Sequence, residues 1–536
     1  MLRASRSGRR RAGRLMRRLA LALLMLMTAP LHARSIEGRP VAVAAPAGTL
    51  EGRAGDGVEG FVGIPYAAPP VGPLRWRPPE PAPRWQGVRV AAAFGNDCPQ
   101  VRFPGDATPS TQPMDEDCLT LNLWRPEGAA AGSPGEGGAP RPRLPVMVWI
   151  HGGSFVAGSS NSPVLDGAAL ARRGVLLVSF NYRLGRFGFF AHPALTREAG
   201  GRPHANFAFL DMIAALQWVK ANAAAFGGDP ANVTIFGESA GGSAVNFLVA
   251  SPMAEGLFDK AIVMSGANRE RFARIDVDRP GRTSAQFAGV GFAAKAGLQQ
   301  PDAAALRALP ADKVQGGLAM WDLQGEIFAG PVIDGHSVVA DPIERFSSVA
   351  VPRIPYIIGS TSAELSEESY APVMMDLVRA RSSNAAMALL ERAYGDPPGF
   401  GLIDDFMFTE AARGYARIMA GHGAPAWRYI FDHVAEADRA GRKGAAHASE
   451  LAYLFGNLPD SAGPSDRETA RLMGDYFTNF AATGDPNGAG LPAWPRQAVG
   501  DPLLRFGATG AEAGSDASQA RLDAVEQAAT MRRAGE

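Results

Sequence analysis

Apolar segments of strand length alternate along this chain with segments of helical periodicity. Residues 144–150 (LPVMVWI) and 174–181 (GVLLVSFN) are apolar at consecutive positions, which is typical of strands that are buried on both faces. Residues 209–225 repeat apolar side chains at helical spacing, and the strand-like segment 232–236 is followed by a helix pattern from about Ala240. Further strands are predicted at 261–264, 356–358 and 427–431. The alternation predicts an α/β fold in which helices cover both faces of a large, mostly parallel sheet.

The domain organisation follows from length and from low-complexity segments. A chain of 536 residues allows up to three domains, but a single enzyme built on one large sheet also reaches this size. Residues 36–507 show no repeat and no change of composition, so we expect one α/β domain at 34–507 with long loop and helical excursions. The Gly-, Ala- and Pro-rich stretch 128–143 is predicted to be a surface loop. Residues 508–536 are predicted to be a low-complexity tail with a short helix near 517–533.

The N-terminal segment has the pattern of an export signal. The first 18 residues hold eight arginines and no acidic residue, an apolar run extends from Leu19 to Pro30, and Leu31-His32-Ala33 follows. A run of this length is too short to span a bilayer, so we predict no permanent membrane helix. The pair Arg17-Arg18 leaves a twin-arginine route open beside the general one. We expect residues 1–33 to be removed on export, the alternative being a disordered basic tail.

Charge and cysteine content exclude several classes of protein. Lys plus Arg (53) equals Asp plus Glu (53), so no bulk positive charge favours a nucleic-acid partner. Two cysteines are too few for a disulfide scaffold or a Cys-rich metal site, and no His, Cys and Asp cluster indicates a metal. Cys98 and Cys118 would be able to pair in an oxidising compartment, whereas in the cytosol two buried thiols would be the simpler interpretation.

A candidate nucleophile lies between a predicted strand and a predicted helix. The segment Gly237-Glu238-Ser239-Ala240-Gly241 directly follows the strand pattern 232–236. A tight strand-to-helix turn holds its serine in a strained conformation, and only glycine two residues away on either side lets the backbones pass. The serine then lies at a helix N-terminus, where backbone amides favour developing negative charge. A plain glycine-rich turn is the alternative, and the flanking segments favour the nucleophile.

A second glycine segment offers the amides that a serine nucleophile requires. His151-Gly152-Gly153 directly follows the strand 144–150. Two consecutive glycines there can turn their N–H groups toward Ser239, and the amide of Ala240 would be a third donor. Such a pair is often only a turn. Beside the Ser239 turn, however, it predicts an oxyanion hole formed by Gly152, Gly153 and Ala240.

Several ordered segments carry a resemblance to a known family. The chain resembles the type-B carboxylesterases, the α/β-hydrolases that include the cholinesterases. The matching segments, besides that of Ser239, are 61–72 (FVGIPYAAPPVG) with Leu74-Arg75, 116–122 (EDCLTLN), 181–185 (NYRLG), 226–230 (FGGDP) and 479–487 (NFAATGDPN). The resemblance implies an α/β-hydrolase fold and a catalytic triad of Ser239, Glu364 and His447, in the chain order of that fold. It also implies structural pairs, namely the disulfide Cys98–Cys118 and the ion pairs Arg75–Glu116 and Arg183–Asp211.

The implied triad differs from the family pattern at two neighbouring positions, and three other residues compete with it for the roles of acid and base. The family has glycine after the acid and after the base, where this chain has Leu365 and Ala448. The other histidines after Glu364 are His422 and His433, which we interpret as solvated or structurally satisfied side chains. The rival acid is Asp334, whose segment 330–335 (GPVIDG) resembles a structural motif of the family.

The resemblance and the residues together predict a serine carboxylesterase. A small carboxylic ester and water would be its partners, the reaction would pass through an acyl-enzyme, and no metal or organic cofactor is needed. Alternatives are an inactive binding module of the same fold, or a lipase, thioesterase or amidase with the same triad. A lipase would need an apolar lid, and residues 269–324 mix charges freely. Pocket walls are predicted from 155–163, 269–324 and 366–385, with Trp321 and Phe328 as candidate lining side chains.

Overall fold

The computed structural model describes residues 35–103, 105–129, 142–279, 282–319, 330–348, 351–369 and 371–534. The predicted export signal at 1–33 lies outside the described residues, as do most of the predicted surface loop at 128–143 and the candidate lining residues Trp321 and Phe328. Within the described residues, no helix combines the length and the apolar character that crossing a bilayer requires.

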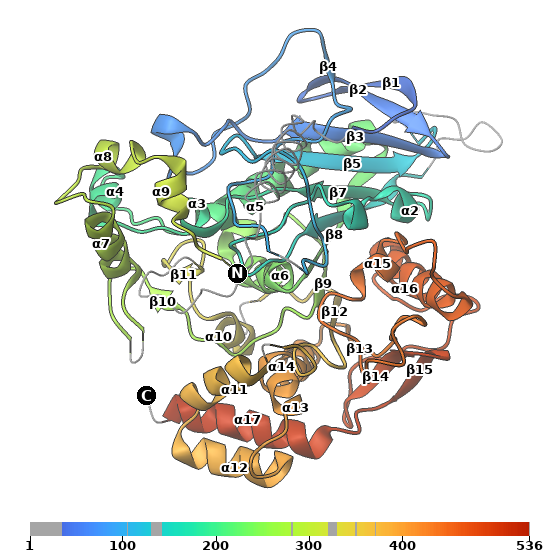
Figure 1. Ribbon diagram of the computed structural model, residues 1–536. Coiled ribbons are helices and arrows are strands. Elements are labelled where there is room, and N and C mark those ends of the chain that lie inside the picture. Colours follow the sequence, from blue (N-terminus) through green and yellow to red (C-terminus); the bar gives the residue numbers. More distant parts are fainter. Residues whose placement is uncertain are drawn as a thin grey trace, which may run out of the picture.

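One large sheet organises the molecule, with thirteen strands among the described residues (Figure 1). Its order is β1-β2-β3-β5-β7-β6-β8-β9-β12-β13-β14-β15, and β4 pairs with β2. The strands are β1 (Arg39–Ala45), β2 (Gly48–Gly55), β3 (Val58–Pro65), β4 (Val88–Val90), β5 (Thr120–Pro126), β6 (Leu144–Ile150), β7 (Leu176–Phe180), β8 (Gly228–Glu238), β9 (Lys260–Met264), β12 (Tyr356–Thr361), β13 (Ala426–Phe431), β14 (Pro502–Gly507) and β15 (Gly510–Ser515). A separate parallel pair joins β10 (Ala273–Arg274) and β11 (Val332–Ile333).

The centre of the sheet is parallel and its two ends are antiparallel. From β7 through β6, β8, β9, β12 and β13 to β14, every neighbouring pair is parallel. The pairs β1–β2, β2–β3, β3–β5, β5–β7 and β14–β15 are antiparallel. The predicted mostly parallel sheet is therefore confirmed, with antiparallel ends in addition. Parallel strands bring their carboxyl ends to the same edge, which is where ligand sites of open α/β sheets form.

Helices cover both faces of the sheet, as the alternation of patterns predicts. The helices are α2 (Ala168–Ala171), α3 (Gly185–Gly188), α4 (Pro193–Glu198), α5 (Phe207–Asn222), α6 (Ala240–Ala250), α7 (Ala285–Lys295), α8 (Ala303–Arg307), α9 (Ala311–Gln315), α10 (Pro342–Ser347), α11 (Ala371–Ala380), α12 (Asn384–Tyr394), α13 (Gly401–Asp404), α14 (Glu410–Gly421), α15 (Leu451–Leu454), α16 (Pro464–Thr483) and α17 (Gln519–Ala534). A π-helical turn, Asp405–Thr409, joins α13 to α14.

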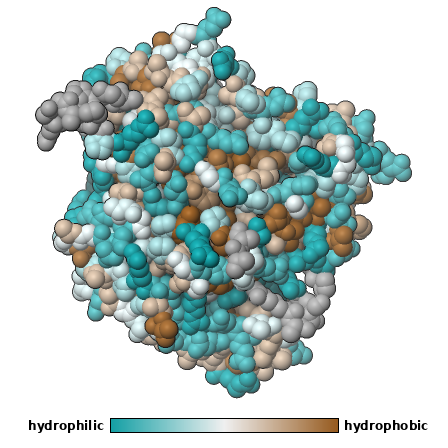
Figure 2. Space-filling view, turned by 180° about the vertical axis from the view of Figure 1, so that it is seen from behind, coloured by the Kyte–Doolittle hydropathy of each residue, from teal (hydrophilic) through white to brown (hydrophobic). Residues whose placement is uncertain are grey.

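Side chains of β6 show how the two faces are filled. Val146, Val148 and Ile150 belong to the apolar cluster that α5, α6 and α14 close, while Met147 and Trp149 belong to the cluster that α15 and α16 close. Successive strand residues point to opposite faces, so a strand covered on both sides is apolar throughout. Seen from behind, the outer surface is mostly hydrophilic, with apolar residues gathered toward the middle of that face (Figure 2).

The C-terminal segment is folded against the rest of the chain. Residues 508–536, for which we predicted a tail with a short helix near 517–533, hold the strand β15 and, close to that position, the helix α17. The strand forms an antiparallel hairpin with β14 at the sheet end, and α17 lies beside α12 and α14 in Figure 1. Val525 and Ala528 of α17 are buried in an apolar cluster with α11, α12 and α13. The Ala- and Gly-rich composition of this segment hides its strand and its packing in the sequence, because only its few larger apolar residues pack against the rest of the chain.

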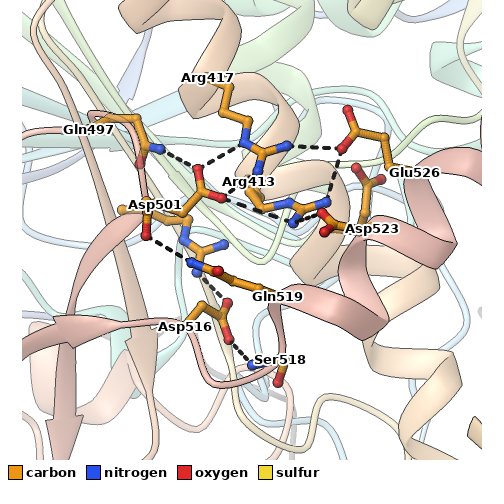
Figure 3. A network of polar contacts seen from close by, with 12 residues as sticks. Arg413, Arg417, Gln497, Asp501, Asp516, Ser518, Gln519, Asp523 and Glu526 are labelled. Atoms are coloured by element: carbon orange, nitrogen blue, oxygen red, sulfur yellow. Dashed lines mark hydrogen bonds and ion pairs between the residues drawn. The ribbon is translucent and has the colours of Figure 1, made fainter. Parts of the chain in front are cut away.

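Ion pairs fasten α17 to α14 (Figure 3). Arg413, fully buried on α14, bonds to Asp523 at 2.7 Å and to Glu526 at 3.0 Å, both on α17. The next turn of α14 contributes Arg417, which bonds to Asp501 at 2.5 Å and also to Glu526 at 3.0 Å. A buried guanidinium is stable only when it is paired, so this cluster requires α17 in place.

The structural pairs that the resemblance implies are all present. Cys98 and Cys118 form a disulfide. Arg183 bonds to Asp211 at 2.7 and 2.8 Å, and both side chains are buried. Arg75 forms a bidentate ion pair with Glu116. These charges therefore hold loops together.

Candidate active site

The serine turn begins at the end of β8 and ends where α6 starts. Ser239 has φ 56° and ψ −123°, a strained conformation for a residue with a side chain. A Cβ on Gly237 would lie 2.5 Å from backbone atoms of Gly241, and a Cβ on Gly241 would overlap the carbonyl oxygen of Ile150. The two glycines are therefore required by close approach of three backbone segments, as the sequence predicts. The Ser239 amide donates to the Met264 carbonyl of β9 at 2.9 Å, which fixes the turn to the sheet.

The predicted acid lies in the loop after β12. Glu364 is fully buried, and its Oε1 accepts a hydrogen bond from the amide of Thr361 at 2.8 Å. Its Oε2 lies 2.5 Å from Nδ1 of His447. Leu365, where the family has glycine, does not have a positive φ, and its side chain packs in an apolar cluster with Met375. Glycine's conformational freedom is therefore not needed at this position.

The predicted base meets both partners. Nε2 of His447 lies 2.9 Å from Oγ of Ser239, while Nδ1 faces Glu364. The backbone amide of His447 also donates to the Glu364 carbonyl at 3.1 Å, which joins the two loops. Ala448 has φ 63°, so the left-handed conformation that suits glycine is kept here by a residue with a Cβ. The structure thus brings together three side chains that are far apart in the sequence.

The rival residues are engaged elsewhere. His433 is buried, with Nε2 2.7 Å from Asp466. His422 is the residue that ends α14. Asp334 accepts hydrogen bonds from Asn206 and from two backbone amides of its own loop. The side-chain contacts of His433 and Asp334 thus belong to the scaffold.

The predicted amide donors lie beside the serine. A Cβ on Gly152 would lie 3.1 Å from the Cβ of Ser239, and Gly153 has φ 101°, which requires glycine. Within the described residues, none of the amides of Gly152, Gly153 and Ala240 donates a hydrogen bond. Tyr182 donates its hydroxyl to the His151 carbonyl at 2.8 Å, which anchors the start of this loop. Three unused amides beside a nucleophile can stabilise an oxyanion.

Comparison with known proteins identifies the family. The sequence profile of the Carboxylesterase family matches residues 39–389 and 400–521. The chain belongs to this family. Fumonisin B1 esterase of Sphingopyxis macrogoltabida is 34% identical over 493 residues, covering 86% of this carboxylesterase and 85% of the relative. Para-nitrobenzyl esterase of Bacillus subtilis (strain 168) is 34% identical over 476 residues, covering 84% and 91%.

Solved structures agree with the sequence comparison. A structure of PNB esterase superposes with a TM-score of 0.75 at 30% identity, covering 90% of this chain and 99% of that one. The carboxylesterase EST55 of Geobacillus stearothermophilus gives 0.74 at 33% identity, with the same coverage. The fold is therefore the α/β-hydrolase fold, and the enzyme is a carboxylic-ester hydrolase, as the sequence predicts.

Two further buried glutamates, Glu238 and Glu450, interact electrostatically with His447 of this carboxylesterase. Oε1 of Glu238, the residue before Ser239, lies 3.2 Å from Nε2 of His447. Glu450 is fully buried, and neither of its carboxylate oxygens has a hydrogen-bond partner among the described residues. With Glu364, two buried carboxyl groups therefore contact the imidazole, and the charge of a third, Glu450, also acts on it.

Burial and mutual repulsion control the protonation of this acidic cluster. Burial raises the pKa of Glu238 to about 7, against the opposing effect of His447, and Glu364 adds to the rise. Burial also raises the pKa of Glu450 well above its usual range, and the charges of Glu238 and Glu364 add to the rise. Burial by itself lowers the pKa of His447, but the carboxylates of Glu238 and Glu364 outweigh it and raise the pKa above the ordinary value. The pKa values of His447, Glu238 and Glu450 therefore depend on one another.

Sequence reasoning did not assign a role to either additional glutamate. Glu238 stands inside the serine motif, and Glu450 ends the His447-Ala-Ser-Glu450 segment. From the sequence, each is seen only as part of a motif, and neither is given a function of its own. An acidic residue directly before Ser239 and another three residues after His447 are the available signal, because carboxylates near catalytic residues often shift the pKa of a catalytic group. Within the described residues, no group of three His, Cys, Asp or Glu side chains is arranged to hold a metal ion.

Proposed function

We propose that this carboxylesterase hydrolyses its ester in two acyl-transfer steps, with Ser239 as nucleophile, His447 as general base and acid, and Glu364 as the orienting carboxylate. The observation that carries the proposal is the continuous contact from Ser239 Oγ to His447 Nε2 at 2.9 Å and from His447 Nδ1 to Glu364 Oε2 at 2.5 Å. Both distances allow hydrogen bonds, which proton transfer requires.

The first step forms the acyl-enzyme. Ser239 Oγ attacks the ester carbonyl carbon while its proton moves to Nε2 of His447, and the C=O electrons move onto the carbonyl oxygen. The amides of Gly152, Gly153 and Ala240 stabilise this oxyanion. When the intermediate collapses, the C–O bond to the alcohol breaks and His447 gives its proton to the departing oxygen. Glu364 holds the imidazole ring in place and stabilises its cationic form.

The second step reverses these roles with water. His447 takes a proton from a water molecule, and the water oxygen attacks the acyl carbon. The bond to Ser239 Oγ breaks, the carboxylic acid leaves, and the proton returns from His447 to the serine. Nucleophile and base are thereby restored, so the proposed cycle consumes only ester and water.

A chain-length series of p-nitrophenyl esters tests the proposal on three proteins. The wild type is compared with Ser239→Ala and with the matched control Ser251→Ala, whose hydroxyl accepts a backbone hydrogen bond just beyond α6. We expect Ser239→Ala to lose ester turnover and Ser251→Ala to keep it. A p-nitrophenyl phosphonate should label the wild type once, on the peptide that holds Ser239. Equal turnover by wild type and Ser239→Ala would reject the nucleophile, and a preference for long chains would favour a lipase.

We also propose that the chain is exported. The Cys98–Cys118 disulfide supports this, since such bonds persist mainly in oxidising compartments. Mass spectrometry of the protein from a bacterial periplasm or medium should find an N-terminus after Ala33. Recovery of the active, oxidised protein only from the cytosol, with residues 1–33 still attached, would contradict the proposal.

A further inference from the structure

A fourth carboxylate binds the loop that carries the proposed catalytic acid. Asp404 is the last residue of α13 and is 5% exposed. Its Oδ1 accepts hydrogen bonds from the amide of Leu365 at 2.8 Å and from the amide of Ser366 at 3.0 Å. These are the two residues that directly follow Glu364. The contact therefore lies one peptide unit away from the carboxylate that meets His447.

Other hydrogen bonds hold Glu364 itself and the segment that follows Ser366. Thr361 donates its amide to the side chain of Glu364, and His447 donates its amide to the main-chain carbonyl. Further on, Glu367 accepts from the Lys443 amide and Glu368 from Arg442. After Glu364, the side chain of Leu365 is held by apolar packing, which fixes position less sharply than a hydrogen bond. Asp404 is the acceptor for the amides of the two residues that directly follow Glu364, and a buried amide needs such an acceptor.

Asp404 is itself held at a point that touches both catalytic loops. It is followed by the π-helical turn Asp405–Thr409, and turns of this kind occur often at functional sites. Thr409 of the turn lies 3.3 Å from the hydroxyl of Ser360, on the strand that leads to Glu364. The ring of Phe408, in the same turn, lies 5.2 Å from the imidazole of His447.

Asp405, the residue after Asp404, attaches the same π-helical turn to α12 and α17. Asp405 accepts the hydroxyl of Tyr394 on α12 at 2.8 Å and lies 3.5 Å from Arg521 on α17. Successive helical residues point in different directions, so Asp404 faces the catalytic loop while Asp405 faces the C-terminal helix. The turn is thereby immobilised between the two.

We propose that Asp404 is a positioning residue for ester hydrolysis, which keeps Oε2 of Glu364 within hydrogen-bond distance of His447 by accepting the Leu365 and Ser366 amides. The inference rests on the proposed triad. The positioning role requires an acceptor oxygen where Oδ1 of Asp404 lies. It does not require this group to be charged. Burial raises the pKa of Asp404 to about 7, and Glu364 adds to the rise, so a neutral carboxyl group is compatible with this role.

The test compares Asp404→Ala with Asp404→Asn. Alanine removes the acceptor, and we expect kcat per active site to fall by about 10²-fold, the cost of a displacement of about 1 Å at a catalytic group, with KM nearly unchanged. Asparagine keeps a carbonyl oxygen in the place of Oδ1 and should recover most of that loss. Active sites are counted by the burst of p-nitrophenol that a phosphonate releases, so unfolded protein does not contribute. Asp404→Ser, whose hydroxyl is too short to reach both amides, replaces alanine if that variant does not fold.

Asp334→Ala is the matched control, because Asp334 is also a buried carboxylate that holds two amides of a loop. It should lower the melting temperature and leave kcat per titrated site unchanged. Asp404→Ala behaving like this control would overturn the positioning role, and so would Asp404→Asn being as slow as Asp404→Ala. Ser239→Ala and Glu364→Gln are measured in the same series. If both remain active, the triad fails, whereas if both are inactive and Asp404→Ala is not, only the positioning role fails.

Discussion

Replacement of Glu238 by glutamine should move the acid limb of the pH profile to lower pH. In the free enzyme His447 must be neutral to accept the serine proton, so the acid limb of kcat/KM reports its pKa. The ionised carboxylate of Glu238, 3.2 Å from Nε2, stabilises the imidazolium and raises that pKa. Glu238→Gln keeps the shape and removes the charge. The pKa of His447 therefore falls, and the neutral base persists at lower pH.

The size of the shift follows from the distance. Two unit charges 3.2 Å apart interact by about 1.3 kcal/mol at the dielectric constant of water and by about 5 kcal/mol at an effective value of about 20. These energies correspond to about one and about four pH units, at about 1.4 kcal/mol for each unit. The pKa of Glu238 is itself raised to about 7 by burial, so near neutral pH its charge is only partly present. We therefore expect a shift of about one to two units, at the lower end of the range.

The assay is the pH dependence of kcat/KM for p-nitrophenyl acetate at constant ionic strength. Glu468→Gln is the matched control, because Glu468 is an exposed carboxylate on α16 that is bonded to Arg471. This control should leave the acid limb where it is. An acid limb that stays in place in Glu238→Gln, or moves to higher pH while the protein remains folded, would refute the electrostatic reasoning.

The remaining predictions concern backbone fit and ion pairs. Gly241→Ala places a Cβ on the carbonyl oxygen of Ile150 and should lower stability by about 1–3 kcal/mol and esterase turnover with it, whereas Gly291→Ala, in open space on α7, should do neither in urea unfolding and rate assays. Arg413→Ala removes a buried side chain whose partners on α17 are exposed, so it should lower the free energy of unfolding by about 1–3 kcal/mol in urea titrations, and an unchanged free energy would contradict the role of these ion pairs. Ala448→Gly relieves about 1–2 kcal/mol of left-handed strain against about 0.5–1 kcal/mol of chain entropy, so its melting temperature should be equal or higher, with turnover unchanged.

The sequence is most informative at positions where backbone segments approach one another closely. Gly237 and Gly241 are required by the approach of Ile150 and by the strain at Ser239, and crowding of this kind leaves a motif that can be read from the letters alone. The same holds for the apolar runs of the central strands, because burial on both faces removes the polar alternation. Glu364 and His447 lie in loops and carry no such local signal. They were reached only through a family resemblance.

The C-terminal segment shows what the sequence does not contain in readable form. Its strand and helix are weakly apolar, and much of their stabilisation comes from charges on other elements, such as Arg413 and Arg417 of α14. These ion pairs join residues more than eighty positions apart, so they leave no repeating pattern in the sequence. The role of Asp404 has the same origin, since its partners are two backbone amides and leave no trace in the side-chain pattern.

The acidic cluster around His447 follows from the charge that the proposed reaction creates. When the serine proton moves to Nε2, the imidazole becomes a buried cation, and carboxylates already in place stabilise it without reorganisation. The same carboxylates would also hold a proton on the histidine before the reaction, which would remove the base. Only interactions that are stronger in the transition state than before it accelerate the step. The raised pKa values of Glu238 and Glu450 weaken this opposing effect, because a carboxyl group that is protonated holds a resting proton on the histidine less strongly than a carboxylate does. Glu364 contacts Nδ1, the ring nitrogen opposite the one that faces Ser239, and is therefore placed to stabilise the cation as it forms.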